Sequence, residues 1–189
     1  MRIVGGSLRG RKIDPPISMT TRPMTDRARE GLFNILAHRE WGTGTEPLFE
    51  TPIHVLDAFC GTGALAFEAL SRGAAQATLF DKDPSAAAVA RQNAEKLGVA
   101  ERCLIMRLDT LRPTRASAPC QLIFLAQPHR SALALPAFLA LREAGWVAPH
   151  ALLVVETASH EPPQPLPACE IVLDRAYGAL TLHFMVCQN

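Results

Sequence analysis

Short apolar runs alternate along the chain with longer stretches in which apolar residues return every three or four positions. The short runs favour buried strands, and the longer stretches favour helices. Strands that alternate with helices indicate a parallel sheet with right-handed crossover connections. The predicted strands of this α/β fold are 53–57, 77–81, 103–106, 121–125 and 151–156.

The predicted helices begin and end at residues with familiar capping chemistry. Thr25 and Ser131 each precede a helical stretch as a side-chain cap, Pro84 opens another, and Gly98 and Gly145 follow helix ends. The predicted helices are 25–38, 64–71, 84–98 and 131–145.

Both ends of the chain depart from this alternation. Apolar and polar residues alternate on either side of Gly178, which predicts an antiparallel hairpin formed by 171–175 and 180–186. Near the N-terminus, 2–13 is predicted to be a short β-arm with glycines as turn points. The length suits a single domain. We expect one domain over 1–189, with an arm at 1–22 and a doubly wound α/β core at 53–189.

Charge is unevenly distributed along the sequence. Residues 1–30 contain seven basic and three acidic side chains, a net charge of +4, whereas the remaining 12 basic and 15 acidic side chains sum to −3. An arginine-rich arm on a weakly acidic body is typical of a polyanion-binding protein, although a solvated basic surface is the alternative. The side chains expected to contact phosphates are Arg9, Arg11, Lys12, Arg22, Arg27 and Arg29.

Cysteine usage indicates a reducing environment. The five cysteines form no C-x-x-C pair and are odd in number, which argues against a disulfide framework and against a zinc site. The histidines have no metal-ligand spacing, so no metal is expected. No apolar run approaches the roughly 20 residues of a membrane span. We therefore expect a cytoplasmic protein without a membrane partner.

The strongest chemical signal is the segment Asp57-Ala-Phe-Cys-Gly-Thr-Gly-Ala-Leu-Ala66 between a predicted strand and a helix. Glycines at such a turn let a ligand approach the backbone. Asp81 ends the next strand and can accept hydrogen bonds from the hydroxyls of a ribose. Cys60 lies inside the turn without a neighbouring histidine, so we interpret it as a small filler rather than a nucleophile.

Asp57 distinguishes between two classes of cofactor. A carboxylate at the turn repels the pyrophosphate of a dinucleotide but attracts the ammonium and sulfonium groups of S-adenosylmethionine (SAM). SAM is therefore favoured over the alternative, an NAD-type cofactor of an oxidoreductase. The expected cofactor-binding residues are Asp57, Phe59, Gly61, Gly63, Asp81 and Asp109, the last of which can accept from the adenine amino group.

Three segments resemble the bacterial 16S ribosomal RNA guanine-N2 methyltransferases. They are Arg2-Ile-Val-Gly-Gly-Ser-Leu-Arg-Gly-Arg-Lys-Ile13, Arg22-Pro-Met-Thr-Asp-Arg-Ala-Arg-Glu-Gly-Leu-Phe-Asn34 and the glycine turn with its helix up to Ala74. The second is close to that family's R-P-T-x-D-R-x-R-E-x-L-F-N. The resemblance implies a Rossmann-like class I methyltransferase fold with SAM as cofactor. It further implies methylation of the exocyclic N2 amine of a guanine in small-subunit rRNA. The expected partner is this rRNA, free or in the small ribosomal subunit, and we expect the protein to be a monomer.

One motif departs from the family. The family carries (D/N)-P-P-(F/Y) after the fourth strand, where this chain has Ala126-Gln127-Pro128-His129. In the family the acidic or amide side chain and the following carbonyl accept hydrogen bonds from the target amine, and the aromatic ring stacks on the flipped base. Ala126 has no side-chain acceptor, whereas Gln127 can serve as a substitute and His129 can stack.

Three alternatives stay open on the sequence. The chain is an active methyltransferase with a rebuilt site, a catalytically weak or silent SAM- and RNA-binding protein, or an enzyme for a different acceptor. A general base is not required, because the guanine amine can lose its proton after transfer, so a stacking or structural role is favoured for His129.

Overall fold

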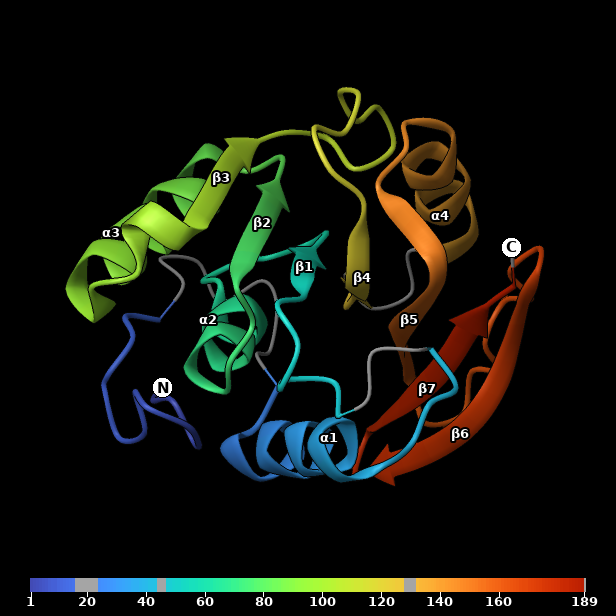
Figure 1. Cartoon of the computed structure of the whole chain (residues 1–189), viewed down its shortest axis with the longest axis horizontal. Coiled ribbons are helices and arrows are strands. Elements are labelled where there is room, and N and C mark those ends of the chain that lie inside the picture. The colour runs from blue at the N-terminus through green and yellow to red at the C-terminus, as the bar shows by residue number, and fades with distance from the viewer. Residues whose placement is uncertain (16–23, 44–46, 128–131, 189) are drawn as a thin grey trace.

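Within the described residues, seven strands form one sheet in the order β3-β2-β1-β4-β5-β7-β6 (Figure 1). The computed structural model describes residues 1–15, 24–43, 47–127 and 132–188. The strands are β1 (His54–Asp57), β2 (Gln76–Asp81), β3 (Cys103–Arg107), β4 (Cys120–Leu125), β5 (Val147–Ala158), β6 (Cys169–Tyr177) and β7 (Leu180–Cys187). Strands β1 to β5 are parallel, and β7 runs antiparallel to both β5 and β6. The predicted α/β sheet with its closing hairpin is confirmed.

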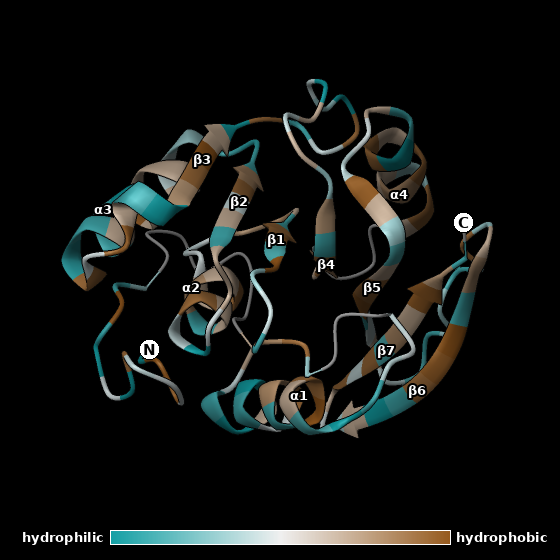
Figure 2. Ribbon diagram, in the orientation of Figure 1, coloured by the Kyte–Doolittle hydropathy of each residue, from teal (hydrophilic) through white to brown (hydrophobic). Residues whose placement is uncertain are grey.

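Helices cover both faces of this sheet. One apolar cluster joins the sheet to α1 (Asp26–His38), α2 (Ala64–Ser71) and α3 (Pro84–Leu97), and a second joins the opposite face to α4 (Ala134–Glu143). A 3-10 turn at Ala100–Arg102 leads into β3. Polar residues lie on the outward surface of α3, whereas much of the length of the strands consists of apolar residues (Figure 2). This layered arrangement brings the carboxyl ends of the parallel strands to one edge of the sheet.

Local chemistry explains most element boundaries. The hydroxyl of Thr25 accepts a hydrogen bond from the backbone N–H of Ala28 at the start of α1, and the Asp83 carboxylate caps α3 in the same way. Helix α4 differs from its prediction, because it begins at Ala134 without a side-chain cap, and Ser131 lies outside the described residues. Strand β5 is longer than predicted at both ends. Its start already pairs with β4 at Val147, and its end continues to pair with β7 beyond the last residue of β4.

The N-terminal arm is folded onto the body. Arg2 and Lys12 form an antiparallel bridge, and the N–H of Ile3 donates to the carbonyl of Arg11 at 2.9 Å. Ile3 and Ile13 are completely or almost completely buried in the cluster that also holds α1 and α2. The β-arm is thus present as predicted, and its apolar residues belong to the main core.

One disulfide corrects the expectation from cysteine usage. Cys169 and Cys187 face one another in the β6–β7 register, with their Cα atoms 4.0 Å apart, and are bonded. Cys60, Cys103 and Cys120 are free thiols. An odd cysteine count does not exclude a single bridge. Counting residue by residue from the turn would place Glu170 opposite Cys187, and it is a one-residue register shift between Ile171 and Leu173 that brings Cys169 there.

Candidate functional site

The glycine turn lies between the carboxyl end of β1 and the start of α2. Both Gly61 and Gly63 have positive φ, at 52° and 82°. A Cβ atom on Gly63 would lie 2.4 Å from the ring of Phe67, so helix packing excludes a side chain there. A Cβ atom on Gly61 would meet nothing within 4 Å. The backbone at Gly61 is therefore open to a ligand, whereas Gly63 is required by the fold itself.

Asp57 ends β1 with its carboxylate buried beneath the turn. One oxygen, Oδ2, accepts a hydrogen bond from the N–H of Ala66 at 3.3 Å, and Oδ1 has no hydrogen-bond partner among the described residues. Burial, aided by the nearby charge of Asp81, raises the pKa of Asp57 to about 7 despite the hydrogen bond from Ala66. A buried carboxylate oxygen without a donor fits the ammonium group of a ligand bound at the turn.

Asp81 meets the turn from the end of β2. Its Oδ2 accepts from the N–H of Gly61 at 2.9 Å, and its Oδ1 accepts from the N–H of Asp83 at 2.9 Å. The side chain is only half-buried, so lone pairs remain for donors from a ligand. The structure thus brings Asp57, Gly61 and Asp81 together at one edge of the sheet.

The segment after β3 completes this edge. The N–H of Leu108 donates to the carbonyl of Asp81 at 2.9 Å, and the hydroxyl of Thr110 donates to the carbonyl of Ala58 in the turn. Asp109 lies between them with an exposed side chain, whose Oδ1 accepts from the N–H of Leu111 at 3.1 Å. Asp109 is therefore near Asp81 but more open to solvent.

Phe59 and Cys60 occupy the turn between Asp57 and Gly61. Phe59 is half-buried and packs against the apolar cluster on the α4 face. Burial raises the pKa of the Cys60 thiol well above its ordinary value, and the charges of Asp57 and Asp81 add to the increase. A thiol in these surroundings does not form the thiolate that a nucleophile needs.

The altered motif follows β4, the strand next to β1. Phe124 pairs with Asp57, which places Ala126 and Gln127 at the same edge of the sheet as the turn. Both are half-buried, and Ala126 packs against the main apolar cluster. Pro128 and His129 lie outside the described residues.

The six basic side chains assigned to phosphate binding fall into four groups, of which the last is the buried Arg29. Arg9, Lys12 and Arg27 are exposed. Arg11 is also exposed, but its guanidinium donates to the carbonyl of Lys96. Arg22 lies outside the described residues.

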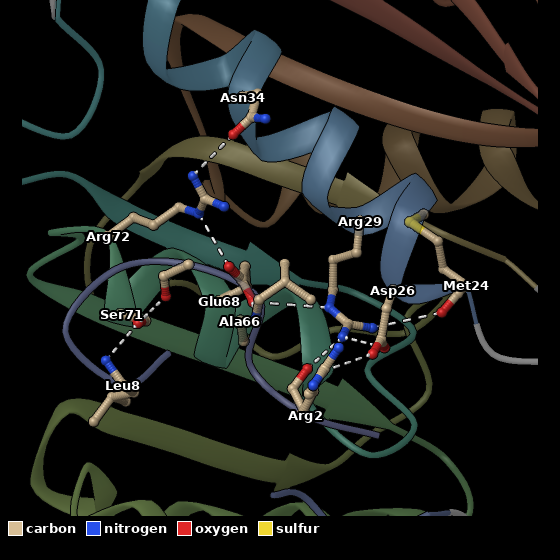
Figure 3. Close-up of polar contacts among 12 residues, drawn as sticks. Arg2, Leu8, Met24, Asp26, Arg29, Asn34, Ala66, Glu68, Ser71 and Arg72 are labelled. Atoms are coloured by element: carbon tan, nitrogen blue, oxygen red, sulfur yellow. Dashed lines mark hydrogen bonds and ion pairs between the residues drawn. The ribbon is translucent and has the colours of Figure 1, made fainter. Parts of the chain in front are cut away.

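Arg29 must be removed from the predicted phosphate contacts, because its side chain is completely buried. Its guanidinium donates to the carboxylate of Asp26 at 2.9 Å and to the carbonyl of Arg2, and it lies 3.8 Å from Glu68 (Figure 3). Periodicity placed this arginine on α1 but could not tell which side of the helix it occupies relative to the arm.

Glu68 is the centre of this buried network and was missed by sequence reasoning. Its carboxylate on α2 accepts from the N–H of Val4 at 2.9 Å and from the guanidinium of Arg72 at 3.0 Å, while Arg29 lies nearby (Figure 3). The available signal was a glutamate within an otherwise apolar helix, with an arginine four residues later. The network fixes the arm to α1 and α2.

Metal-ligand clusters and membrane-spanning helices are both absent from the described part of the chain. No group of three or more His, Cys, Asp and Glu side chains in that part is arranged to hold a metal ion. None of the helices within it is both long and apolar enough to cross a bilayer.

Known proteins match this chain over most of its length. Residues 1–186 match the family described as Conserved hypothetical protein 95. Ribosomal RNA small subunit methyltransferase D of Escherichia coli K12 is 36% identical over 157 residues, which cover 83% of this chain and 74% of that protein. The protein of the same name from Haemophilus influenzae is 34% identical over 166 residues, which cover 86% of this chain and 81% of that protein.

Solved structures match the fold as well. A hypothetical protein of Thermus thermophilus superposes with a TM-score of 0.76 at 28% identity, and the match covers 100% of this chain and 99% of that one. An RNA methyltransferase from Salinibacter ruber, solved with S-adenosyl-L-homocysteine, gives a TM-score of 0.63 at 15% identity over 89% of this chain and 95% of that one. The Rossmann-like methyltransferase fold implied by the resemblance is confirmed. The chain belongs to the Conserved hypothetical protein 95 family, the family of the ribosomal RNA small subunit methyltransferases D.

Proposed function

We propose that this protein is a SAM-dependent methyltransferase that acts on 16S ribosomal RNA, at the exocyclic N2 amine of a guanine. The observation that carries the proposal is the buried oxygen of Asp57, which lies without a donor beneath an open glycine turn in the described part of the chain. Family membership supports the same conclusion.

Each cofactor-binding residue has a distinct task in this proposal. The Asp57 carboxylate pairs with the amino group of the methionine part. The backbone at Gly61 allows close contact, and Gly63 keeps the turn in the conformation that presents it. Asp81 accepts hydrogen bonds from the ribose hydroxyls, and Asp109 accepts from the adenine amino group. Phe59 supplies apolar contact beside the turn. When bound, the cofactor supplies a methyl group made electrophilic by the adjacent sulfonium.

The exposed basic residues bind the RNA backbone. Arg9, Lys12 and Arg27 are exposed and can contact phosphates, and Arg11 and Arg22 belong to the same basic arm. Such contacts position an RNA without reading its sequence. We include in the proposal that the partner is rRNA or the small ribosomal subunit, that the protein works as a monomer, and that it does so in the cytoplasm.

Base positioning depends on the altered motif. In the proposed reaction the side-chain carbonyl of Gln127 accepts a hydrogen bond from the guanine amine, which orients the nitrogen lone pair toward the methyl group. His129 stacks on the base. Ala126 contributes no acceptor, so the second candidate function is a protein that binds SAM and RNA but transfers methyl groups slowly or not at all.

Mass spectrometry of small-subunit rRNA tests the proposal directly. Ribosomal RNA from cells with and without the gene should differ by one N2-methylguanine, which the purified protein restores in vitro. Normal binding of SAM and RNA without that difference favours the second candidate. Preference for NAD over SAM in a binding assay contradicts both.

A further inference from the structure

Asn93 is a completely buried polar residue on the inner face of α3. Its neighbours on that face are apolar, and they include Ala90, Ala94 and Leu97. A buried amide destabilises a fold unless its donors and acceptor find partners. The hydrogen-bond partners of Asn93 therefore indicate its role in the fold.

The amide of Asn93 makes three hydrogen bonds. Its Oδ1 accepts from the backbone N–H of Asp14 at 2.7 Å, and its Nδ2 donates to the carbonyl of Asp14 at 3.2 Å and to the carbonyl of Thr62 at 3.1 Å. The carbonyls of Asp14 and Thr62 each need a donor, and the N–H of Asp14 needs an acceptor. Only an amide in this orientation satisfies all three.

The two segments that Asn93 joins are distant in the sequence. Thr62 is the residue between Gly61 and Gly63 at the centre of the turn, and it is almost completely buried. Asp14 ends the basic arm, and its carboxylate also pairs with Lys96, one turn along α3, at 2.7 Å. Asn93 therefore connects α3 both to the arm and to the backbone on which a ligand would lie.

We propose that Asn93 is a positioning residue for the cofactor turn. Its Nδ2 holds the Thr62 carbonyl on the side away from the ligand, so that the backbone at Gly61 stays in the conformation that accepts the cofactor. Its two hydrogen bonds to the backbone of Asp14 hold the end of the arm against α3. This inference rests on the proposed function, because it assumes that the ligand of the turn is SAM.

The test compares Asn93→Ala with wild type and with Gln92→Ala, a change at an exposed position one residue away. SAM affinity is measured by calorimetry well below the melting temperature of each variant. Removal of the hydrogen bond to Thr62 predicts about tenfold weaker binding for Asn93→Ala and no change for Gln92→Ala. In a methyl-transfer assay, the KM for SAM should rise by a similar factor while kcat at saturating SAM stays close to wild type.

A second substitution, Asn93→Asp, keeps the size of the side chain and its acceptor but removes both donors. Its deficit in SAM affinity should shrink as pH falls, because a protonated carboxyl group can donate to Thr62 again. The deficit of Asn93→Ala should not change with pH. Hydrogen exchange at the Asp14 amide reports the arm bond separately, and exchange should be faster in Asn93→Ala.

The outcomes separate this inference from the proposed function. Failure of the wild type to bind SAM contradicts the proposed function. Normal SAM binding by wild type and by folded Asn93→Ala alike overturns the inference alone. A lower melting temperature with unchanged affinity also overturns it, because Asn93 would then contribute only to stability.

Discussion

The guanidinium of Arg29 lies 3.8 Å from the carboxylate of Glu68, and the two side chains are 1% and 0% exposed. Removing one partner of a buried pair costs about 3–5 kcal/mol when the other charge is left uncompensated. Glu68 keeps Arg72 at 3.0 Å as a partner, so the loss of Arg29 should cost about 3 kcal/mol, the lower end of that range. Arg29→Ala should therefore lower the free energy of unfolding by about that amount in a denaturant titration. Arg27→Ala is the matched control at an exposed neighbouring position and should leave stability nearly unchanged. Weaker RNA binding by a fully stable Arg29→Ala would return this arginine to the phosphate contacts.

The exposed cations of the arm should give RNA binding a steep dependence on salt. Removing a side chain that pairs with one phosphate reduces the slope of log affinity against log salt by about 1. Arg9→Ala and Lys12→Ala should each do so in filter-binding or fluorescence titrations, with SAM affinity unchanged. Arg175→Ala removes an exposed arginine from β6 instead and should leave the slope as it is. An unchanged slope in the double variant Arg9→Ala, Lys12→Ala would assign the arm a structural role only.

The raised pKa of Asp57 predicts that an increase in pH has opposite effects on the stability of the protein and on its affinity for the cofactor. Its pKa is raised from 3.8 to about 7 in the folded protein, so the folded chain holds a proton that the unfolded chain has lost. Its contribution to stability should therefore be greatest below the unfolded value and should diminish as pH rises toward 7.

Cofactor affinity should instead increase as pH rises to about 7, because a cation favours the ionised carboxylate. Calorimetry in buffers of different ionisation enthalpy should detect proton release on binding below that pH. Asp57→Asn should abolish the release, while Asp109→Asn should retain it. Equal proton release in wild type and Asp57→Asn would mean that another group is responsible.

The altered acceptor motif can be repaired in a single variant. Ala126→Asn, Gln127→Pro and His129→Tyr together restore the side chains of the related enzymes. Recovery of one oriented acceptor should raise methyl transfer at least about tenfold, or about 1.4 kcal/mol in the barrier, if the wild type lacks one. If Gln127 already accepts, the repaired variant gains little and Gln127→Ala abolishes transfer. A fast wild-type rate that survives Gln127→Ala would place base positioning elsewhere.

The disulfide can be checked by counting thiols. Alkylation of the denatured, unreduced protein should label Cys60, Cys103 and Cys120, and prior reduction should add Cys169 and Cys187. Mass spectrometry of the peptides identifies each site. Cys60 should react slowly in the folded protein, because burial raises the pKa of its thiol. Five labelled cysteines without reduction would contradict the bridge.

Features carried by local periodicity and turn chemistry could be predicted from the sequence. The strand ends at Asp57 and Asp81 followed from apolar runs that stop at an acid, and the turn between them followed from Gly61 and Gly63. Contacts between distant segments could not be predicted in this way. Arg29 looked like its exposed neighbours on α1, and only the position of the arm against α2 explains why it is buried with Glu68.

The arm is attached to the body through hydrogen bonds of its backbone as well as through the buried side chains of Ile3 and Ile13. The N–H groups of Val4 and Leu8 donate to the side chains of Glu68 and Ser71, and the carbonyl of Gly5 accepts from the Ser71 hydroxyl. Every residue type except proline offers the same backbone N–H and carbonyl, so substitutions among the outward side chains of the arm leave these bonds intact. Under the proposed function, single arginines or lysines of the arm can therefore be exchanged to change its preference for an RNA surface, while the fold that carries the arm stays the same.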